Sequence, residues 1–461
     1  MSQSRREFLR GTACALGGVA LASSLESFGL VGALAQSGAA DYRALVCIFL
    51  SGGNDCNNTL VDLNQFNGYN SVRNGAGLAI SQSSLLQISP QGGGSFGLHP
   101  SMPEFQTLFG QGRLAIVCNS GPLVEPLTRQ TYQNGTGKKP LQLFSHSDQV
   151  GLWQSAVANS VAQTGWGGRM VDKTNALNGA ATFPPIITIA GISLFVTGVT
   201  SRPLAIADSG TSLANVLPLT MTGTSADSSP RRTAFDQIRA LDANLKLVKA
   251  AADTRSGALS ARTSLQSVNP VISTSFPNTT LGRQLLQVAR VIKASTDPTA
   301  GINMKRQIFF CNLGGFDTHT NQIAGQATLL QQVSQAMSAF YAATVELGLQ
   351  DKVTSFTLSD FGRTFAPSGT GAGVVGSDHG WGNHQFVLGG AVNGGRLYGT
   401  YPTLALNGPD DTDNRGRWIP TTAVEQYAAT LASWYGLAGG DFPAVFPLLD
   451  RFPTPNLGFM I

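Results

Sequence analysis

Histidine is scarce in this chain, and three of its five histidines lie in two short strings that also contain aspartate, residues 314–319 and 377–384. Imidazole and carboxylate groups are the usual protein ligands of zinc and also bind other divalent metals. The strings therefore predict a metal site formed by Asp317, His319, Asp378, His379 and His384. The same residues would also be expected if the Asp and His side chains only formed hydrogen bonds that support loops.

Asp317 and His319 are two positions apart and follow the apolar run 307–313. Side chains at i and i+2 of an extended segment point to the same side, so both groups can reach one cation. A carboxylate and an imidazole at the end of a buried run also need partners, because an unpaired polar group in the interior costs several kcal/mol.

Two further aspartates follow apolar runs. Asp55 comes after residues 43–50 in a glycine-rich turn, where it either binds a metal or only shapes the turn. Asp360 follows the run 353–358, and Arg363 comes three residues later. Asp360 is a candidate metal ligand. Arg363 can bind an anion, or it can form an ion pair with Asp360 that shapes the turn.

The position of a nucleophile is less defined. Ser145 and Ser147 lie just before residues 150–158, which have a helical pattern. At the start of a helix, N–H groups and the helix dipole stabilise anions, so either hydroxyl is a candidate catalytic group. Serine at this place also commonly caps a helix without any catalytic role. His99 has no acid nearby in the sequence, and we expect it to be structural.

Buried strands must position these groups. Continuous apolar runs, typical of parallel strands that are covered on both faces, occur at 43–50, 113–118, 185–190, 307–313, 353–358 and 386–388. Segments with a helical spacing of apolar residues lie between and after them, at 235–251, 281–294, 327–348 and 422–435. The alternation of strand and helix predicts a doubly wound α/β sheet, in which ligands bind at the carboxyl ends of the strands.

Two regions interrupt the alternation, one near 74–97, rich in Gly, Ser and Gln, and one near 193–274, rich in Ser, Thr and Ala. We interpret them as insertions, the second of which forms a cap. The sequence shows no repeat with a period of about 20 to 50 residues, the range typical of repeat proteins. It therefore predicts one α/β domain over residues 41–461 that carries both insertions.

Residues 1–35 have the features of a twin-arginine export signal. Arg5 and Arg6 precede a mildly apolar stretch that begins at Gly11, and residues 33–35 (Ala-Leu-Ala) resemble a cleavage site. The chain has no apolar span of about 20 residues, so we expect no transmembrane anchor. The predicted location is the periplasm or the outside of the cell, reached after folding and metal uptake in the cytoplasm.

The charge balance argues against some classes of function. Removal of residues 1–35 takes three arginines and two glutamates from 30 basic and 26 acidic residues, which leaves 27 minus 24, a formal charge of +3. The sequence has no cluster of Lys and Arg interleaved with aromatic residues, so we do not expect nucleic-acid binding. Small anionic substrates need only a local site.

Four cysteines follow the signal, namely Cys47, Cys56, Cys118 and Cys311. Their spacing does not match a Cys-x-x-Cys metal site. Three of them lie within apolar, strand-like runs, which favours buried free thiols over a disulfide framework.

Taken in order, the motifs resemble those of an exported bacterial family of unknown function, of the DUF1501 type. After the signal, the motifs are 50–55 (Leu-Ser-Gly-Gly-Asn-Asp), 98–100 (Leu-His-Pro), 145–146 (Ser-His), 165–166 (Gly-Trp), 316–319 (Phe-Asp-Thr-His), 359–364 (Ser-Asp-Phe-Gly-Arg-Thr) and 378–380 (Asp-His-Gly). The resemblance covers nearly the whole chain after the signal. The family in turn is distantly similar to the superfamily of alkaline phosphatases and sulfatases.

This second resemblance implies an alkaline-phosphatase-like α/β/α sandwich of three layers, in which Asp and His at successive strand ends bind two metal ions. It assigns the nucleophile's place to Ser145 or Ser147, and metal ligation to Asp55, Asp317, His319, Asp360 and His379. One residue departs from the pattern, because Phe361 stands where the superfamily often has a histidine next to the aspartate. His379 or His384 then supplies the missing ligand, or only one metal binds.

We therefore expect an exported metal-dependent hydrolase of phosphate or sulfate esters, with a small anionic ester as substrate. Zinc suits mixed Asp and His ligands, and magnesium, manganese and calcium are alternatives. The alternative function is a non-catalytic cell-envelope protein that uses the same scaffold to bind an exported protein partner or a glycan. In a third interpretation, the Asp and His residues only support loops and bind no metal.

Overall fold

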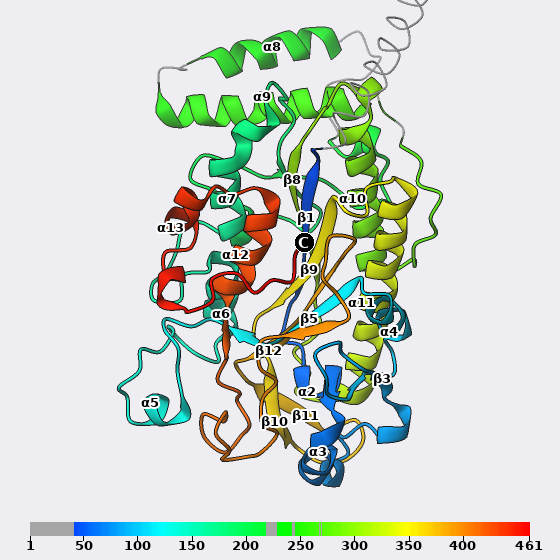
Figure 1. The fold of residues 1–461 in the computed structure, drawn as a ribbon. Helices are drawn as coiled ribbons and strands as arrows, with labels where there is room; N and C mark the ends of the chain where they lie inside the picture. Colours follow the sequence, from blue (N-terminus) through cyan, green and yellow to red (C-terminus); the bar gives the residue numbers. More distant parts are fainter. Residues whose placement is uncertain (1–40, 218–227, 242–244, 267, 269) are drawn as a thin grey trace, which may run out of the picture.

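In the computed structural model, which describes residues 41–217, 228–241, 245–266, 268 and 270–461, a nine-stranded sheet forms the middle of the molecule (Figure 1). The proposed export signal lies outside these described residues. The strands are β1 (Arg43–Leu50), β5 (Leu114–Gly121), β6 (Ile186–Thr188), β7 (Leu204–Ala205), β8 (Arg306–Leu313), β9 (Val353–Ser359), β12 (Asn383–Gly389), β13 (Arg396–Tyr398) and β14 (Thr422–Ala423). Their order is β13-β5-β12-β9-β1-β8-β6-β7, with β14 also paired to β5.

Most strand pairs are parallel, and the central strand β1 pairs in parallel with β8 on one side and β9 on the other. The exception is β12, which runs antiparallel to both β5 and β9. The six predicted strands are all present, but the prediction that residues 386–388 form a parallel strand was wrong. A continuous apolar run shows that both faces of a strand are covered and does not reveal its direction.

Helices cover both faces of this sheet because the side chains of β1 alternate between two buried layers. Ala44, Val46 and Ile48 pack in one core with the helices α4 (Pro103–Gly110), α10 (Thr280–Thr296) and α11 (Gln322–Glu346). Leu45, Cys47 and Phe49 pack in the other core with α6 (His146–Ser155), α7 (Trp166–Thr174) and α12 (Val424–Tyr435). Figure 1 shows the two sets of helices on opposite sides of the strands. The predicted α/β/α sandwich of three layers is confirmed.

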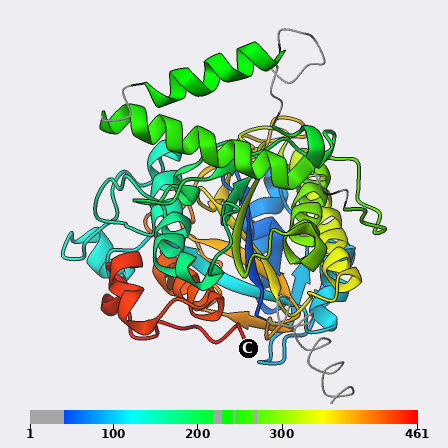
Figure 2. The ribbon, with the colours of Figure 1, turned by 90° about the horizontal axis from the view of Figure 1, so that it is seen from above.

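Three of the four predicted long helices are also present, as α10, α11 and α12. The fourth prediction, a single helix over 235–251, was wrong. This region holds two helices, α8 (Ser228–Ala240) and α9 (Lys246–Gln266), which lie side by side (Figures 1 and 2). The apolar spacing continues from one helix to the next, so periodicity alone did not reveal the break.

Two small sheets lie beyond the carboxyl ends of the central strands, near the short helix α2 (Cys56–Thr59) that follows β1 (Figure 1). One consists of β2 (Leu60–Asp62), β4 (Phe96–Leu98) and β3 (Leu86–Ile88), and the other of β10 (Arg363–Ser368) and β11 (Gly376–His379). β3 lies in the region near 74–97 that we interpreted as an insertion. The helices α8 and α9 lie in the second such region, at the opposite end of the sheet (Figure 1).

The four cysteines in the described part of the chain are buried and free, as expected. No helix within that part is long and apolar enough to cross a membrane.

Candidate metal centre

The candidate site lies where three neighbouring central strands end. β9, β1 and β8 are adjacent and parallel, so the loops that follow them meet at one edge of the sheet. Asp360 follows β9 directly, and Asp317 follows β8 after three residues. Gly52, in the loop after β1, donates its backbone N–H to Asp360 Oδ1 at 3.0 Å. This is the place in an open α/β sheet where ligands bind.

Two glycines let the three loops approach closely. Gly52 has φ +114°, and a Cβ atom there would lie 2.3 Å from the backbone nitrogen of Asp317. Gly53 has φ +84°, and its Cβ would lie 2.4 Å from the ring of Phe361. Only glycine adopts such backbone angles without strain and leaves this space free. The glycine-rich motif after β1 therefore fixes the distance between the loops that carry Asp317 and Asp360.

Three imidazole rings converge on the carboxylate of Asp317. The Nε2 atoms of His319, His146 and His379 lie 3.0, 3.4 and 3.5 Å from Asp317 Oδ1. His319 Nε2 is also 3.0 Å from His379 Nε2. His146 is the first residue of α6 and His379 the last residue of β11. We call these four residues the histidine cluster.

The spacing of the histidine cluster suits a metal ion. Zinc binds imidazole nitrogen and carboxylate oxygen at about 2.0–2.2 Å, so neighbouring ligands in a tetrahedron stand about 3.3–3.6 Å apart. The separations from Asp317 Oδ1 fall at or just below this range. Among the described residues, the group that offers ligand atoms all within 4.8 Å of one another consists of His146, Asp317 and His379, and His319 is not part of it. The donor set therefore fits a divalent cation of this kind.

The second ring nitrogen of two histidines is held in the way that ligating histidines require. His379 Nδ1 lies 2.7 Å from the carbonyl oxygen of Phe144. A carbonyl oxygen only accepts, so Nδ1 carries the proton and Nε2 has a free lone pair. His146 Nδ1 lies 2.7 Å from Asp360 Oδ2, and in the tautomer whose Nδ1 donates to this carboxylate, Nε2 presents its lone pair to the cluster. Burial lowers the pKa of His379, which favours the neutral ring.

The free nitrogen of His146 is the most informative atom of the site. Its Nε2 is buried and has no hydrogen-bond partner within the described part of the chain. It faces Asp317 Oδ1 at 3.4 Å. A lone pair that faces a carboxylate oxygen is repulsive unless a proton or a cation lies between them. The arrangement is therefore one in which a cation would satisfy both atoms.

The third histidine contacts a partly buried ion pair. His319 Nδ1 lies 3.3 Å from Asp378 Oδ1, and Arg415 forms an ion pair of 2.5 Å with Asp378 Oδ2. Arg417, two residues later, donates from Nε to the backbone oxygen of His379 at 3.0 Å. The structure thus places Asp378 behind a histidine, as it does Asp360, and not among the groups that converge on Asp317.

Phe361 occupies the space between two of the rings. It is buried, stacks on His379 with ring centroids 4.7 Å apart, and lies 4.7 Å from the ring of His146. His146, the first residue of α6, thus packs against the same aromatic ring as His379.

Arg363 is turned toward the cluster and not toward solvent. Its side chain is fully buried, and Nη1 donates to Asp317 Oδ1 at 2.6 Å. Burial by itself would raise the pKa of Asp317, but the hydrogen bond and charge of Arg363, with His319 and His146, lower it overall. Arg363 therefore keeps the Asp317 carboxylate ionised and oriented, and we place its role there and not in binding a free anion.

Two of the residues that we expected at the site lie elsewhere. Asp55 is enclosed in a separate buried group with Arg73. His384 is buried, its Nδ1 accepts the backbone N–H of Asn119 at 3.0 Å, and burial lowers its pKa to about 4. The structure does not bring either side chain to the histidine cluster. Their buried partners, Arg73 and Asn119, lie in parts of the chain that carry no recognisable motif.

The two candidate nucleophiles are also directed away. Ser145 Oγ donates to Asp148 Oδ2 at 2.6 Å, and Ser147 Oγ lies 3.4 Å from the same oxygen. Neither hydroxyl has a hydrogen bond to the histidine cluster within the described residues. His146, between them, is the residue that sequence reasoning missed. The available signal was the scarcity of histidine, which applied to position 146 as much as to 319 and 379.

The fold and the site together define a class, an α/β/α protein with a histidine-rich candidate metal centre at the carboxyl edge of its sheet. A model of the family described as a protein of unknown function, DUF1501, matches residues 42–414. The chain belongs to this family. No curated protein matches the sequence.

Several solved structures are similar to the chain, with low TM-scores and low sequence identity. The PsFucS1 sulfatase from Pseudoalteromonas sp. is 8% identical, with 92% of this chain and 71% of that chain covered and a TM-score of 0.31. The lipoteichoic acid synthase LtaP from Listeria monocytogenes is 6% identical, with 83% and 76% covered and a TM-score of 0.31. The C-terminal periplasmic domain of EcEptC from Escherichia coli, in complex with Zn, is 8% identical, with 87% and 84% covered and a TM-score of 0.32. The activity of this chain must be inferred from its own residues.

Proposed function

We propose that this protein is an exported metal-dependent hydrolase of phosphate or sulfate esters. The metal is a divalent ion, with zinc favoured over magnesium, manganese and calcium because imidazole predominates among the ligands. The observation that supports the proposal best is the convergence of three Nε2 atoms on Asp317 Oδ1, with the Nδ1 atoms of His146 and His379 held by acceptors. The twin-arginine signal that we predict from the sequence of residues 1–35 supports a location outside the cytoplasm.

In this proposal the ion is held by His146, His319, His379 and Asp317. A bound ion supplies Lewis-acid chemistry, because it stabilises negative charge on the oxygens of the ester. The partly buried guanidinium groups of Arg415 and Arg417 border the cluster, where they pair with Asp378 and Asp413. Paired N–H groups of arginine suit phosphate and sulfate oxygens, so N–H groups that these aspartates do not use can bind an ester anion. The substrate in this proposal is therefore a small anionic ester.

A second candidate function is binding without catalysis. In this case the protein uses the same centre to hold an anionic glycan or an exported protein partner. The observation that favours it is the direction of Ser145 and Ser147, whose hydroxyls contact Asp148 and not the histidine cluster. A hydrolase with this arrangement must take its nucleophile from solvent.

The test is metal analysis of the purified full chain, followed by a screen of phosphate monoesters, phosphate diesters and sulfate esters with zinc, magnesium and manganese. We expect wild-type protein to bind metal and to turn over at least one ester class. The variant His146→Ala should lose metal and at least about 100-fold in turnover, because it removes a ligand. His384→Gln is the matched control, a buried histidine outside the cluster, and should keep its metal.

Two results would separate the candidates. Metal-free wild-type protein with full stability would contradict the metal centre and both functions built on it. Metal binding without turnover of any ester would reject the hydrolase and favour the binding protein.

A further inference from the structure

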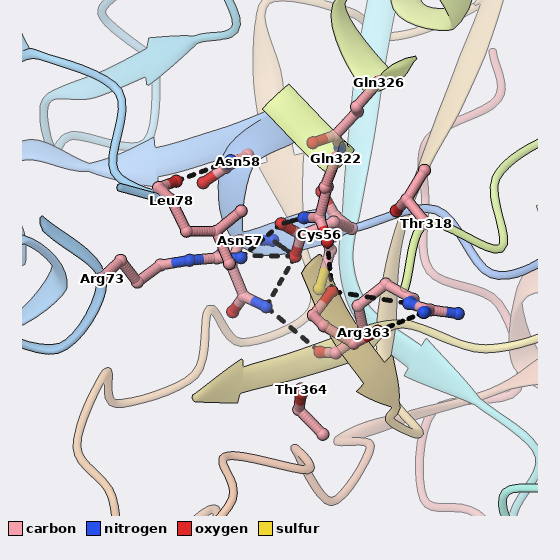
Figure 3. Close-up of polar contacts among 12 residues, drawn as sticks. Cys56, Asn57, Asn58, Arg73, Leu78, Thr318, Gln322, Gln326, Arg363 and Thr364 are labelled. Atoms are coloured by element: carbon pink, nitrogen blue, oxygen red, sulfur yellow. Dashed lines mark hydrogen bonds and ion pairs between the residues drawn. The ribbon is translucent and has the colours of Figure 1, made fainter. Parts of the chain in front are cut away.

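Asp55, which the resemblance placed among the metal ligands, is surrounded by hydrogen-bond donors, of which Asn57, Arg73 and Gln322 are labelled in Figure 3. Its side chain and that of Arg73, the last residue of α3 (Phe66–Arg73), are both 0% exposed and form an ion pair of 2.6 Å. Oδ1 accepts the backbone N–H and Nδ2 of Asn57 at 3.1 and 2.9 Å. Oδ2 also accepts Nε2 of Gln322, at 2.5 Å.

These donors leave Asp55 no capacity for a metal ion. A carboxylate has about four lone-pair positions. The two bonds from Asn57, the bond from Gln322 and the ion pair with Arg73 occupy them. The charge of Asp55 is also already balanced by the buried guanidinium of Arg73. The structure therefore removes Asp55 from the expected ligand set.

A chain of hydrogen bonds connects Asp55 to the histidine cluster instead. Gln322 donates to Asp55, and its Oε1 accepts the hydroxyl of Ser377 at 2.5 Å. Arg363 donates from Nη2 to the backbone oxygen of Ser377, and its Nε lies 3.5 Å from Ser377 Oγ. Arg363 Nη1 then donates to Asp317 Oδ1 at 2.6 Å. Figure 3 shows Gln322 and Arg363 on the same side of the group, with Arg73 entering from the other.

The Asp55 carboxylate determines which atoms donate and which accept in this series of hydrogen bonds. An ionised carboxylate only accepts, so Gln322 must present Nε2 to Asp55 and Oε1 to Ser377. Arg363 only donates, so it must point its free N–H groups at the Ser377 and Asp317 oxygens. The side chains of Asp55, Gln322, Ser377 and Arg363 are buried, and hydrogen bonds in such surroundings are strong and orient their members.

From this geometry we infer that the protein holds a single metal ion, and that Asp55 is a positioning residue for it. Asp55 acts through Gln322, Ser377 and Arg363 on Asp317, which is the ligand. The inference rests on the proposed function, because it assumes that the histidine cluster binds a metal. Of the two expectations, two ions or only one, it selects the centre with one ion, and it makes Asp55 the partner of Arg73 and not a ligand.

The experiment measures the number of zinc ions per chain and their affinity by competition with a chelator. Asp55→Asn leaves Arg73 buried without its counter-ion and is expected to fold poorly, so the main variant is Gln322→Met. Gln326→Met is the matched control, because Gln326 lies one turn later on α11, is equally buried and donates to the backbone oxygen of Asp55 at 2.8 Å. Gln326 has no hydrogen bond to Ser377 within the described residues.

We expect one zinc ion per wild-type chain. Gln322→Met should also bind one ion, with an affinity about 10–100-fold lower, as is typical when a group behind a ligand is lost. Gln326→Met should keep the wild-type zinc affinity even if its Tm falls as much as the Tm of Gln322→Met. Equal affinities of the two variants would overturn the positioning role, and two ions per wild-type chain, one of them lost in Asp55→Asn, would overturn the single centre. Wild-type protein without any ion would instead contradict the proposed function itself.

Discussion

A histidine that binds a metal almost always has its other ring nitrogen held by a hydrogen-bond partner, and aspartates are in that position for two of the three histidines of the cluster. Asp360 and Asp378 face Nδ1 of His146 and His319, whereas Asp317 faces the Nε2 atoms. Counting acidic residues near histidines in the sequence cannot separate these two roles. The separation needs the direction of each carboxylate.

Asp360→Asn tests this distinction. In the wild-type protein Asp360 contacts Gly52 through Oδ1 and His146 through Oδ2. The amide of the variant has only one acceptor oxygen and no negative charge beside the His146 ring. We expect the variant to keep its metal ion with an affinity about 10–100-fold lower. Chelator competition measures this, with Asp148→Asn on α6 as a control that should not change affinity. Complete loss of metal, equal to that of His146→Ala, would show that Asp360 is a ligand.

Among the elements, the turn after β1 has the strictest requirement. Gly52→Ala places a Cβ atom 2.3 Å from the backbone of Asp317, at a φ of +114°. We expect the free energy of unfolding to fall by about 2–5 kcal/mol, from backbone strain and overpacking together, and metal affinity to fall with it. Denaturant unfolding and zinc titration measure the two effects.

Gly77→Ala is the matched control for this turn. Gly77 also has a positive φ, +82°, but no atom lies within 4 Å of the position where a Cβ would be. Its loss should therefore cost only about 1–2 kcal/mol of strain and leave metal affinity unchanged. Equal losses of stability and metal affinity in the two variants would show that Gly52 is not required for close packing of the turn against Asp317.

The elements were largely predictable from the sequence, and the contacts between them were not. The strands before Asp317 and Asp360 are continuous apolar runs, so their positions and the loops after them follow from local pattern. The pairing of Asp55 with Arg73 joins the loop after β1 to the end of α3, and neither position signals the other. His146 was overlooked because the start of α6 was interpreted through its serines.

In the whole molecule, the sheet brings together loops that are far apart in the sequence. His146, Asp317 and His379 come from α6, the loop after β8 and the strand β11, and the adjacent strands β9, β1 and β8 place the loops that support them. The buried cores on both faces of the sheet must therefore be intact before the centre forms. Metal binding should accordingly follow global folding.

Global stability should depend on pH through Glu425, a fully buried residue in the first turn of α12. Burial raises its pKa to about 8, although Arg169 and Arg451 oppose the shift, and no side chain among the described residues donates a hydrogen bond to its carboxylate oxygens. The pKa is about 4.3 in an unfolded chain. Between these values the folded protein binds more protons, so this contribution is complete below about pH 4 and is lost as the pH rises to about 8.

Glu425→Gln removes this dependence. Its stability relative to wild type should increase by up to about 1.4 kcal/mol per pH unit between pH 5 and 8. Denaturant unfolding of both proteins at pH 5, 6.5 and 8 measures the difference. A difference that is the same at all three values would show that Glu425 does not titrate in this range.

The central claim is that one ion sits among three histidines and Asp317. A crystal structure of zinc-loaded protein with anomalous scattering data locates every bound zinc directly. We predict one anomalous peak, about 2.0–2.2 Å from Nε2 of His146, His319 and His379 and from a carboxylate oxygen of Asp317. A peak bound to Asp55, or zinc-loaded crystals without a peak at the histidine cluster, would contradict it.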